Sequence, residues 1–231
     1  MSDPEPISIG MVIFPNMTQL DFTAPYEVFS RIPHAQVSVL ARTLDGVRSE
    51  YGLTFMPDST FDAVPQLDVL CVPGGAGVNP LMEDEGFLAF LRQQAAGAKY
   101  VTSVCTGALL LGAAGLLTGY QAATHWQSME LLPLLCAEPV HERIVIDRNR
   151  ITGGGVTAGL DFGLFVAAQL RGEMAAQAIQ LSIEYDPNPP FHSGNPRKAP
   201  PVVVEAVMNR SAQRRAERLE IARRCAARIR S

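Results

Sequence analysis

Short apolar runs rich in branched side chains alternate along the chain with segments whose apolar positions recur at helical spacing. The clearest runs cover residues 7–14, 35–41, 68–73 and 100–104. Such runs are typical of buried strands, because helices cover both faces of a parallel sheet. Strands that alternate with helices therefore predict an α/β fold with a mostly parallel sheet and helices on both of its faces.

The remaining pattern predicts helices, one short strand and two hairpins. Helices are expected after Asp21 with Pro25 in the first turn, from about Pro80 to Ala96, from Cys105 to about Leu116, from Trp126 to Cys136, and from Thr157 to about Glu184 in two pieces. The short strand is 122–125, and the hairpins are 44–57, turning at Asp45-Gly46, and 143–152, turning at Arg148-Asn149.

A proline-rich connector separates most of the chain from a basic tail. We expect an α/β domain at residues 1–185, the connector at 186–201 and a helix at 202–231. The tail's eight Arg and three Glu give it a charge of +5, which leaves −9 on residues 1–201 of a chain whose net charge is −4. A basic helix can bind nucleic acid or a membrane. Because the rest of the chain is acidic, we favour packing of the tail on its own domain or on a second subunit.

The composition fits a globular domain. The 231 residues are 47% hydrophobic and 18% charged, enough apolar surface for a large core. The weakly acidic balance argues against nucleic acid or an anionic membrane as a partner. The chain contains no apolar run of about 20 residues, and residues 1–6 lack the features of a secretory signal. We therefore expect a cytoplasmic protein.

One of the four cysteines differs from the others by its position. Cys71, Cys136 and Cys225 lie within apolar strand or helix patterns and are interpreted as packing residues. Cys105 ends a buried strand and begins a helix, in Ser103-Val-Cys-Thr-Gly107. A sharp strand-to-helix turn exposes a side chain beside helix amides, which stabilise a thiolate. The alternative is a core thiol at a strand end. No cysteine or histidine spacing indicates a metal site.

Three further positions are candidates to act with Cys105. Gly74 and Gly75 follow a strand, where glycines let backbone amides face a crevice; a plain tight turn is the alternative. Asp21 lies past the first strand and could shuttle a proton to the sulfur, or could simply cap a helix. His125 could activate the thiol, or be a core histidine. A dinucleotide site is not favoured, because Pro80 stands where the third glycine of a motif starting at Gly75 would be.

Together these stretches resemble the ThiJ/PfpI superfamily, the cysteine branch of the glutamine-amidotransferase-like fold. The resemblance covers about residues 7–200 and within the superfamily is closest to the bacterial isocyanide hydratases. The matching motifs are Asp21-Phe-Thr-Ala-Pro25, Val72-Pro-Gly-Gly75, Ser103-Val-Cys-Thr-Gly107, Thr124-His-Trp126, Thr152-Gly-Gly-Gly, Thr157-Ala-Gly-Leu-Asp161 and Glu184-Tyr-Asp-Pro-Asn-Pro-Pro-Phe191. Ala24 stands where that family has glycine.

The resemblance implies a flavodoxin-like fold and a cysteine-based hydration of isocyanides. In this implied mechanism Cys105 attacks the terminal isocyanide carbon, Asp21 supplies a proton, and a thioimidate forms. Water then adds with the help of Asp21, and an N-substituted formamide leaves. Thr106 and the amides of Gly74, Gly75 and Thr106 would orient the acid and the adduct. The resemblance further implies a homodimer without cofactor or metal, in which His125 lies outside the catalytic pair.

Three other functions stay open. A glyoxalase- or deglycase-like enzyme could use the same thiol on reactive carbonyls, although such relatives usually have Glu where Asp21 stands. Many AraC-type regulators have a similar ligand-sensing domain, but the 30 residues after the connector are too few for their DNA-binding domain. An exposed, acidic thiol could also serve as an oxidation sensor.

Overall fold

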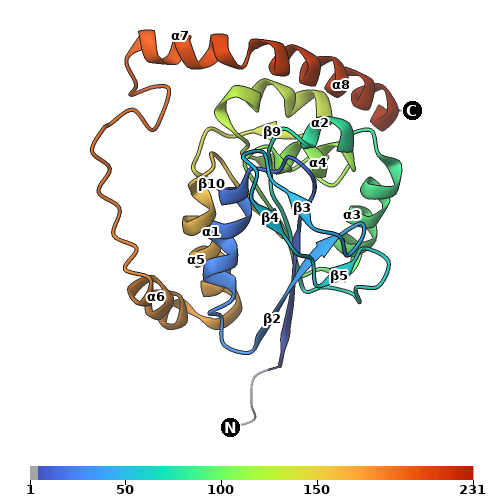
Figure 1. The fold of residues 1–231 in the computed structure, drawn as a ribbon, viewed down its shortest axis with the longest axis vertical. Helices are drawn as coiled ribbons and strands as arrows, with labels where there is room; N and C mark the ends of the chain where they lie inside the picture. The colour runs from blue at the N-terminus through green and yellow to red at the C-terminus, as the bar shows by residue number, and fades with distance from the viewer. Residues whose placement is uncertain (1–4, 231) are drawn as a thin grey trace.

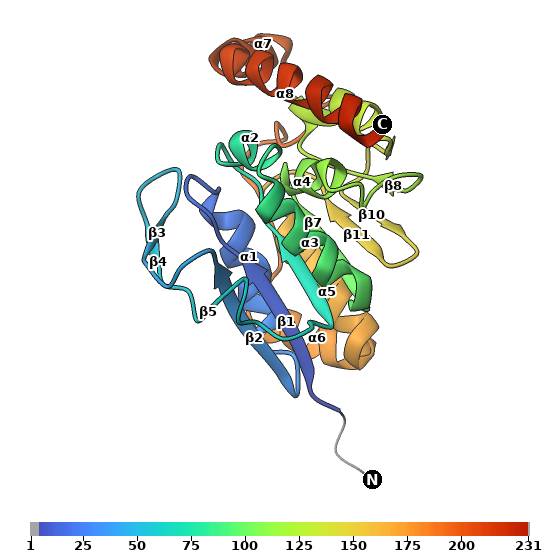
Figure 2. The same ribbon diagram turned by 90° about the vertical axis from the view of Figure 1, so that its right-hand side faces the viewer.

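The computed structural model describes residues 5–230. Within these residues, a seven-stranded sheet forms the centre of the molecule (Figures 1 and 2). Across the sheet the strands are β10 (Ile144–Asp147), β11 (Arg150–Gly153), β7 (Tyr100–Val104), β6 (Val69–Val72), β1 (Ile7–Val12), β2 (Ala35–Ala41) and β5 (Ser59–Thr60). Neighbouring strands are parallel except β10 and β11, which form an antiparallel hairpin. The prediction of a mostly parallel α/β fold is confirmed.

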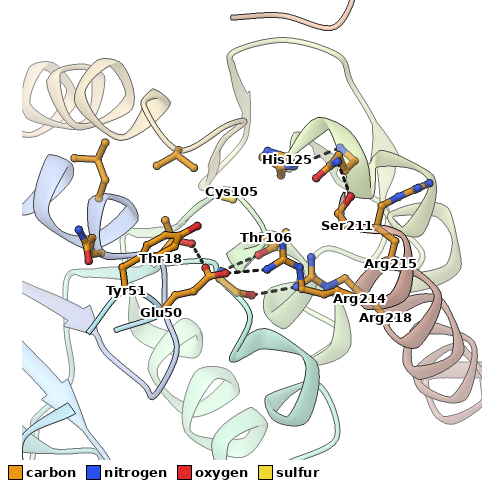
Figure 3. A pocket seen from close by; sticks show the side chains of 15 residues that line it. Thr18, Glu50, Tyr51, Cys105, Thr106, His125, Ser211, Arg214, Arg215 and Arg218 are labelled. Atoms are coloured by element: carbon orange, nitrogen blue, oxygen red, sulfur yellow. Dashed lines mark hydrogen bonds and ion pairs between the residues drawn. The ribbon is translucent and has the colours of Figure 1, made fainter. Parts of the chain in front are cut away.

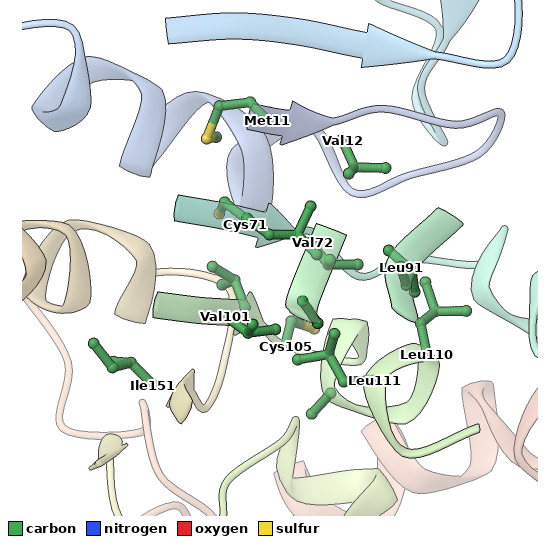
Figure 4. Close-up of a cluster of buried hydrophobic side chains, with 14 of the residues drawn as sticks. Met11, Val12, Cys71, Val72, Leu91, Val101, Cys105, Leu110, Leu111 and Ile151 are labelled. Carbon is green, nitrogen blue, oxygen red and sulfur yellow. The ribbon is translucent and has the colours of Figure 1, made fainter. Parts of the chain in front are cut away.

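Helices cover both faces of this sheet. One layer consists of α1 (Gln19–Phe29) and α5 (Ala158–Arg171), with α6 (Glu173–Ser182) against α5; the other contains α3 (Glu85–Gly97) and α4 (Gly107–Ala113). The residues of β6 are consequently all 0% exposed. Figure 4 shows how Cys71 and Val72 of β6 share the core with Leu110 and Leu111 of α4. The apolar strand runs seen in the sequence are thus explained by burial on two sides.

The strand order places a ligand-binding position at the centre of the sheet. Taken as β2-β1-β6-β7-β11, the order is that of flavodoxin-like folds, in which the chain changes direction between β1 and β6. Ligands bind such sheets at the carboxyl ends of the strands beside this change of direction. Gly74 and Cys105 follow β6 and β7 directly, and Asp21 lies in the first turn of α1, which follows β1. All three residues therefore meet at this edge of the sheet, where the Gly74 amide donates to the Asp21 side chain.

Two predicted helices are interrupted. The segment expected at 80–96 forms α2 (Val78–Leu81) and α3, because Asp84 is extended and caps α3 by accepting a hydrogen bond from the Phe87 amide at 3.0 Å. The segment expected at 126–136 forms two 3₁₀ helices, η1 (Trp126–Leu131) and η2 (Pro133–Leu135). Pro133 separates them, since it has no N–H to continue the first helix.

The predictions of the two hairpins and of the short strand agree with the structure to different degrees. The 143–152 hairpin has the predicted turn, with Arg148 in the left-handed region. The 44–57 hairpin pairs β3 (Val47–Arg48) with β4 (Thr54–Phe55), so it turns within 49–53 and not at Asp45-Gly46. Gly52, at φ 95°, supplies the left-handed residue of that turn. The short strand β8 is Gln121–Ala122, which pairs with β9 (Glu138–Pro139).

The basic tail forms two helices across the carboxyl end of the sheet. After the exposed connector, α7 (Pro201–Arg210) leads into α8 (Ala212–Arg230), and α8 contacts α2, α4, η1 and η2 (Figures 1 and 2). Ala222 and Cys225 are buried in this contact, and Arg224 forms an ion pair with Glu83 at 2.7 Å. In the part of the chain that the structure describes, no helix combines the length and apolar character needed to cross a membrane.

Candidate active site

Cys105 lies at a sharp turn between β7 and α4. Its φ of 56° is in the left-handed region, which a side chain other than glycine rarely adopts. The surrounding structure holds this conformation: the Cys105 amide donates to the Gly153 carbonyl at 3.0 Å, and the Cys105 carbonyl accepts from the Thr124 hydroxyl at 2.8 Å. The side chain is 5% exposed and lines a cavity (Figure 3). The predicted strand-to-helix turn is therefore present, with the sulfur at the base of a pocket.

Asp21 lies behind the cysteine and is completely buried. It is the third residue of α1 and not its N-cap, which corrects the capping alternative and moves Pro25 beyond the first turn. Its Oδ2 accepts a hydrogen bond from the Gly74 amide at 2.9 Å, while Oδ1 has no hydrogen-bond partner among residues 5–230. Burial raises the pKa of Asp21 to about 7, although the Gly74 amide and Cys105 act in the opposite direction. This carboxyl group can therefore hold a proton near neutral pH.

The thiol of Cys105 is not a free thiolate in this environment. Burial raises its pKa well above the ordinary value and the Asp21 carboxylate raises it further, whereas the Thr106 amide and Arg218 lower it. This departs from the sequence-based expectation of an acidic thiol set by helix amides alone. Two groups so close and so buried cannot both be charged, so Cys105 and Asp21 share at least one proton over the neutral range.

The Gly-Gly turn orients Asp21 and Thr106. A Cβ on Gly74 would lie 2.5 Å from the Thr106 amide nitrogen and 2.9 Å from Oδ2 of Asp21, so only glycine fits. The Gly75 amide donates to the Thr106 hydroxyl at 3.0 Å. Both glycine amides thus bind side chains of the site: the Gly74 amide orients the acid, as expected, and the Gly75 amide orients Thr106. A role of backbone amides in binding an adduct stays a prediction, and the Thr106 amide, which stabilises a negative charge on the Cys105 sulfur, is the amide best suited to it.

His125 also lines the cavity but is held as a neutral imidazole. It is the N-cap of η1, where Nδ1 accepts a hydrogen bond from the Gln127 amide at 3.4 Å. Burial lowers its pKa to about 4, and Arg218 and Arg214 lower it as well. A neutral, capping histidine does not supply the imidazolium of a Cys–His pair.

We expect His125→Asn to retain most of the wild-type catalytic activity, within about threefold, because asparagine is also a good N-cap and His125 carries no charge at neutral pH. Steady-state kinetics at pH 7.5, with a thermal melt to confirm folding, measures this. A folded variant that loses more than about a hundredfold in kcat, the size of a general-base effect, contradicts it.

The part of the chain that contains Asp21, the Gly-Gly turn and Cys105 matches a known protein family. The family model described as the DJ-1/PfpI family matches residues 7–169, which include β1, β6, β7 and β11. The chain belongs to the DJ-1/PfpI family.

Several relatives cover different shares of this DJ-1/PfpI protein. It is 52% identical to the isonitrile hydratase of Pseudomonas putida over 223 residues, which are 96% of this chain and 98% of that enzyme. A crystal structure of a ThiJ/PfpI family protein from Pseudomonas syringae covers 94% of this chain and 91% of its own, with 43% identity and a TM-score of 0.92. The transcriptional regulator GbdR of Pseudomonas aeruginosa is 31% identical over 78% of this chain but over 51% of the regulator.

The C-terminal helices, which lie outside the matched region, supply part of the lining of the cavity in this family member. Its volume is about 390 Å³. Its lining includes Cys105, Thr106 and His125, Glu50 and Tyr51 of the 44–57 hairpin, and Ser211, Arg214, Arg215 and Arg218 from α8 and the residue before it (Figure 3). The α8 residues were missed as site residues by the sequence analysis, although their spacing of three and four puts them on one helical face.

The other cysteines do not share the environment of Cys105. Cys71 is 0% exposed within β6, where burial raises its pKa to about 12. Cys225 is 1% exposed on α8, and its thiol donates to the Met82 carbonyl at 3.2 Å. Cys136 is half-buried and in the left-handed region at the end of η2, so it is not the simple packing residue expected. No group of three metal-binding side chains occurs in residues 5–230.

Proposed function

We propose that the protein hydrates isocyanides, R–N≡C, to N-substituted formamides, with Cys105 as the nucleophile and Asp21 as the general acid and base. The observation that carries the proposal is the buried Asp21–Cys105 pair at the base of a cavity, in which a carboxyl of pKa about 7 lies behind a thiol. The isonitrile hydratase that matches nearly the full chain supports the choice of substrate.

The first half of the reaction joins the sulfur to the isocyanide carbon. The pair first passes its single proton from the Cys105 thiol to Asp21, and the Cys105 thiolate then attacks the terminal carbon. An S–C bond forms, Asp21 transfers its proton to that carbon, and the product is the thioimidate R–N=CH–S. The unpartnered Oδ1 of Asp21 is the oxygen suited to carry the proton, since Oδ2 is already occupied by the Gly74 amide.

The second half releases the product and regenerates the thiol. Asp21, now a carboxylate, removes a proton from water as the water oxygen adds to the thioimidate carbon, and it passes that proton to the nitrogen. The S–C bond then breaks as the adduct's hydroxyl proton returns to the Asp21–Cys105 pair, and the formamide R–NH–CHO leaves. The overall balance is one isocyanide and one water consumed for each formamide, with no oxidant or metal required. The Thr106 amide supports the negative charge on the sulfur at both ends of this sequence.

The decisive assay follows the formyl proton of the product by NMR. Purified protein is mixed with cyclohexyl isocyanide and, in parallel, with methylglyoxal. We expect N-cyclohexylformamide to accumulate and methylglyoxal to be left unchanged. Consumption of methylglyoxal without any formamide supports the carbonyl-directed enzyme, and saturable binding of an isocyanide without turnover supports a sensor.

We also propose that the protein is a homodimer. The side chains of Met174, Leu181 and Phe191, on α6 and in the connector, are between 76% and 84% exposed in the single chain. The family resemblance implies a dimer, so we infer that a second copy of the chain covers these apolar side chains. Light scattering after gel filtration distinguishes the dimer from the 25.0 kDa monomer.

A further inference from the structure

Arg218 is a buried cation that reaches the cavity from the C-terminal helix. The residue is 6% exposed, and its guanidinium donates to the Asn79 side-chain oxygen at 2.7 Å, to the Gly75 carbonyl at 3.0 Å and to the Ser128 hydroxyl at 3.4 Å. These three acceptors lie on α2, on the Gly-Gly turn and on η1, so the guanidinium is fixed from three sides. All three are uncharged, so none of them neutralises the positive charge.

Burial of a charge is costly unless an opposite charge lies nearby. Besides Cys105, the charged and titratable groups that act on Arg218 or line the cavity with it are Glu50, Arg214, Arg215 and neutral His125. Glu50 is already paired with Arg214 at 2.8 Å. Cys105 shares the cavity with Arg218, and its anion raises the pKa of Arg218 more than Glu50 does. The sulfur is therefore the group whose charge Arg218 is placed to balance.

We propose that Arg218 is the counter-charge of the Cys105 sulfur, so that the C-terminal helix α8 is a working part of the active site and not only a packing element. Arg218 is a positioning residue: it favours the form of the pair in which the proton is on Asp21 and the charge is on sulfur. It also fixes the carbonyl of Gly75, whose amide orients Thr106. This inference deepens the proposed function, since it concerns the same nucleophile.

The test measures the thiol directly and uses no isocyanide. Cys105 is alkylated with iodoacetamide between pH 5.5 and 10, and the modified fraction is followed by mass spectrometry. Trypsin releases residues 100–143 as one peptide, so a Cys136→Ser background leaves Cys105 as the sole cysteine on it. Because alkylation needs the thiolate, its rate against pH reports how easily the sulfur loses its proton.

Three variants separate the effect of the positive charge of Arg218 from the effect of its hydrogen bonds, which hold α8 on the domain. R218Q loses the charge but keeps a side chain that can donate to Gly75 or Asn79, and R218K keeps the charge but loses the planar fork. R223Q is the matched control, since Arg223 lies on the same helix, exposed and paired with Glu220. We expect R218Q to alkylate about tenfold more slowly at pH 7.5, with its rate–pH profile displaced upward by about one pH unit, because a nearby cation lowers a thiol pKa by that order. R218K and R223Q should stay within twofold of wild type.

Two results overturn the proposal. One is an R218Q profile that coincides with that of wild type. The other is an R218K profile displaced as far as that of R218Q, which would mean that Arg218 acts only through the hydrogen bonds that hold α8 on the domain. If R218Q does not fold, as judged by circular dichroism, R218K still tests the proposal: we expect lowered thermal stability with an unchanged alkylation profile, and a displaced profile contradicts the counter-charge. Since the readout is alkylation, a protein that fails to hydrate isocyanides can still pass or fail this test.

Discussion

Cys105→Ala is expected to lose isocyanide hydration by a factor of about 10⁴ or more, because removal of a covalent nucleophile leaves only the binding contribution. Cys105 is the residue whose sulfur lies at the base of the cavity, against Asp21 and the Thr106 amide. Initial rates of formamide production at saturating isocyanide give the loss in kcat. The substitution replaces a small buried side chain with a smaller one, so the fold should be preserved.

Cys136→Ser provides the matched control for this experiment. Cys136 is a free, half-buried cysteine at the end of η2 and is not among the residues that line the cavity at Cys105. Its replacement should leave the rate within twofold of wild type. A Cys105→Ala protein that keeps a tenth or more of the activity would show that the reaction does not pass through an S–C bond, and the mechanism would have to be abandoned.

Asp21→Asn is expected to lower kcat by roughly 10² to 10⁴, the range found for loss of a general acid or base. Asparagine has nearly the same shape and can still accept the Gly74 amide hydrogen bond, so the loss reports proton transfer. The reactive form carries one proton across Asp21 and Cys105. Since the pKa of Asp21 is about 7, kcat/KM of wild type should rise as pH increases through about 7 and then level off. The variant should lack this step.

A stability measurement checks the burial of Asp21 independently of activity. A carboxyl whose pKa is raised from 3.8 to about 7 on folding is protonated in the native state while the unfolded chain is ionised. Native protein then binds more protons, so this group's contribution to the free energy of unfolding falls as pH rises, by at most roughly 1.4 kcal/mol per pH unit between about 4 and 7. Urea unfolding at pH 5 and pH 7 should show this fall for wild type and a smaller one for Asp21→Asn. Equal slopes would mean that Asp21 is ionised in the folded protein.

The sequence identified the parts of the site that are encoded locally. An apolar run that ends at Cys105 and a helix that begins after it are enough to predict the sharp turn, and the same holds for Gly74 and Gly75 after β6. Because carboxyl ends of parallel strands share one edge, the sequence also predicts that Asp21 meets them. These inferences depend only on the order of strands and helices.

Features that depend on contacts between distant segments could not be predicted in this way. Nothing near Arg218 in the chain indicates that it contacts Gly75, 143 positions earlier, since that contact depends on how α8 crosses the end of the sheet. The direction of the two glycine amides follows from close approach to Asp21 and Thr106, which spacing does not encode. Likewise, Pro25 in a first turn predicts that the helix begins just after Asp21, whereas α1 begins at Gln19 and contains Asp21.

The position of α8 after the cysteine turn in the chain has a consequence for biosynthesis. A ribosome completes β1, β6, β7 and the cysteine turn between β7 and α4 before it translates the codon for Arg218. If Arg218 balances the sulfur's charge, a nascent or prematurely terminated polypeptide holds its thiol in the protonated, unreactive condition. Nucleophilicity is then acquired only after α8 has been synthesised and has packed on the domain, later than the turn that carries the sulfur.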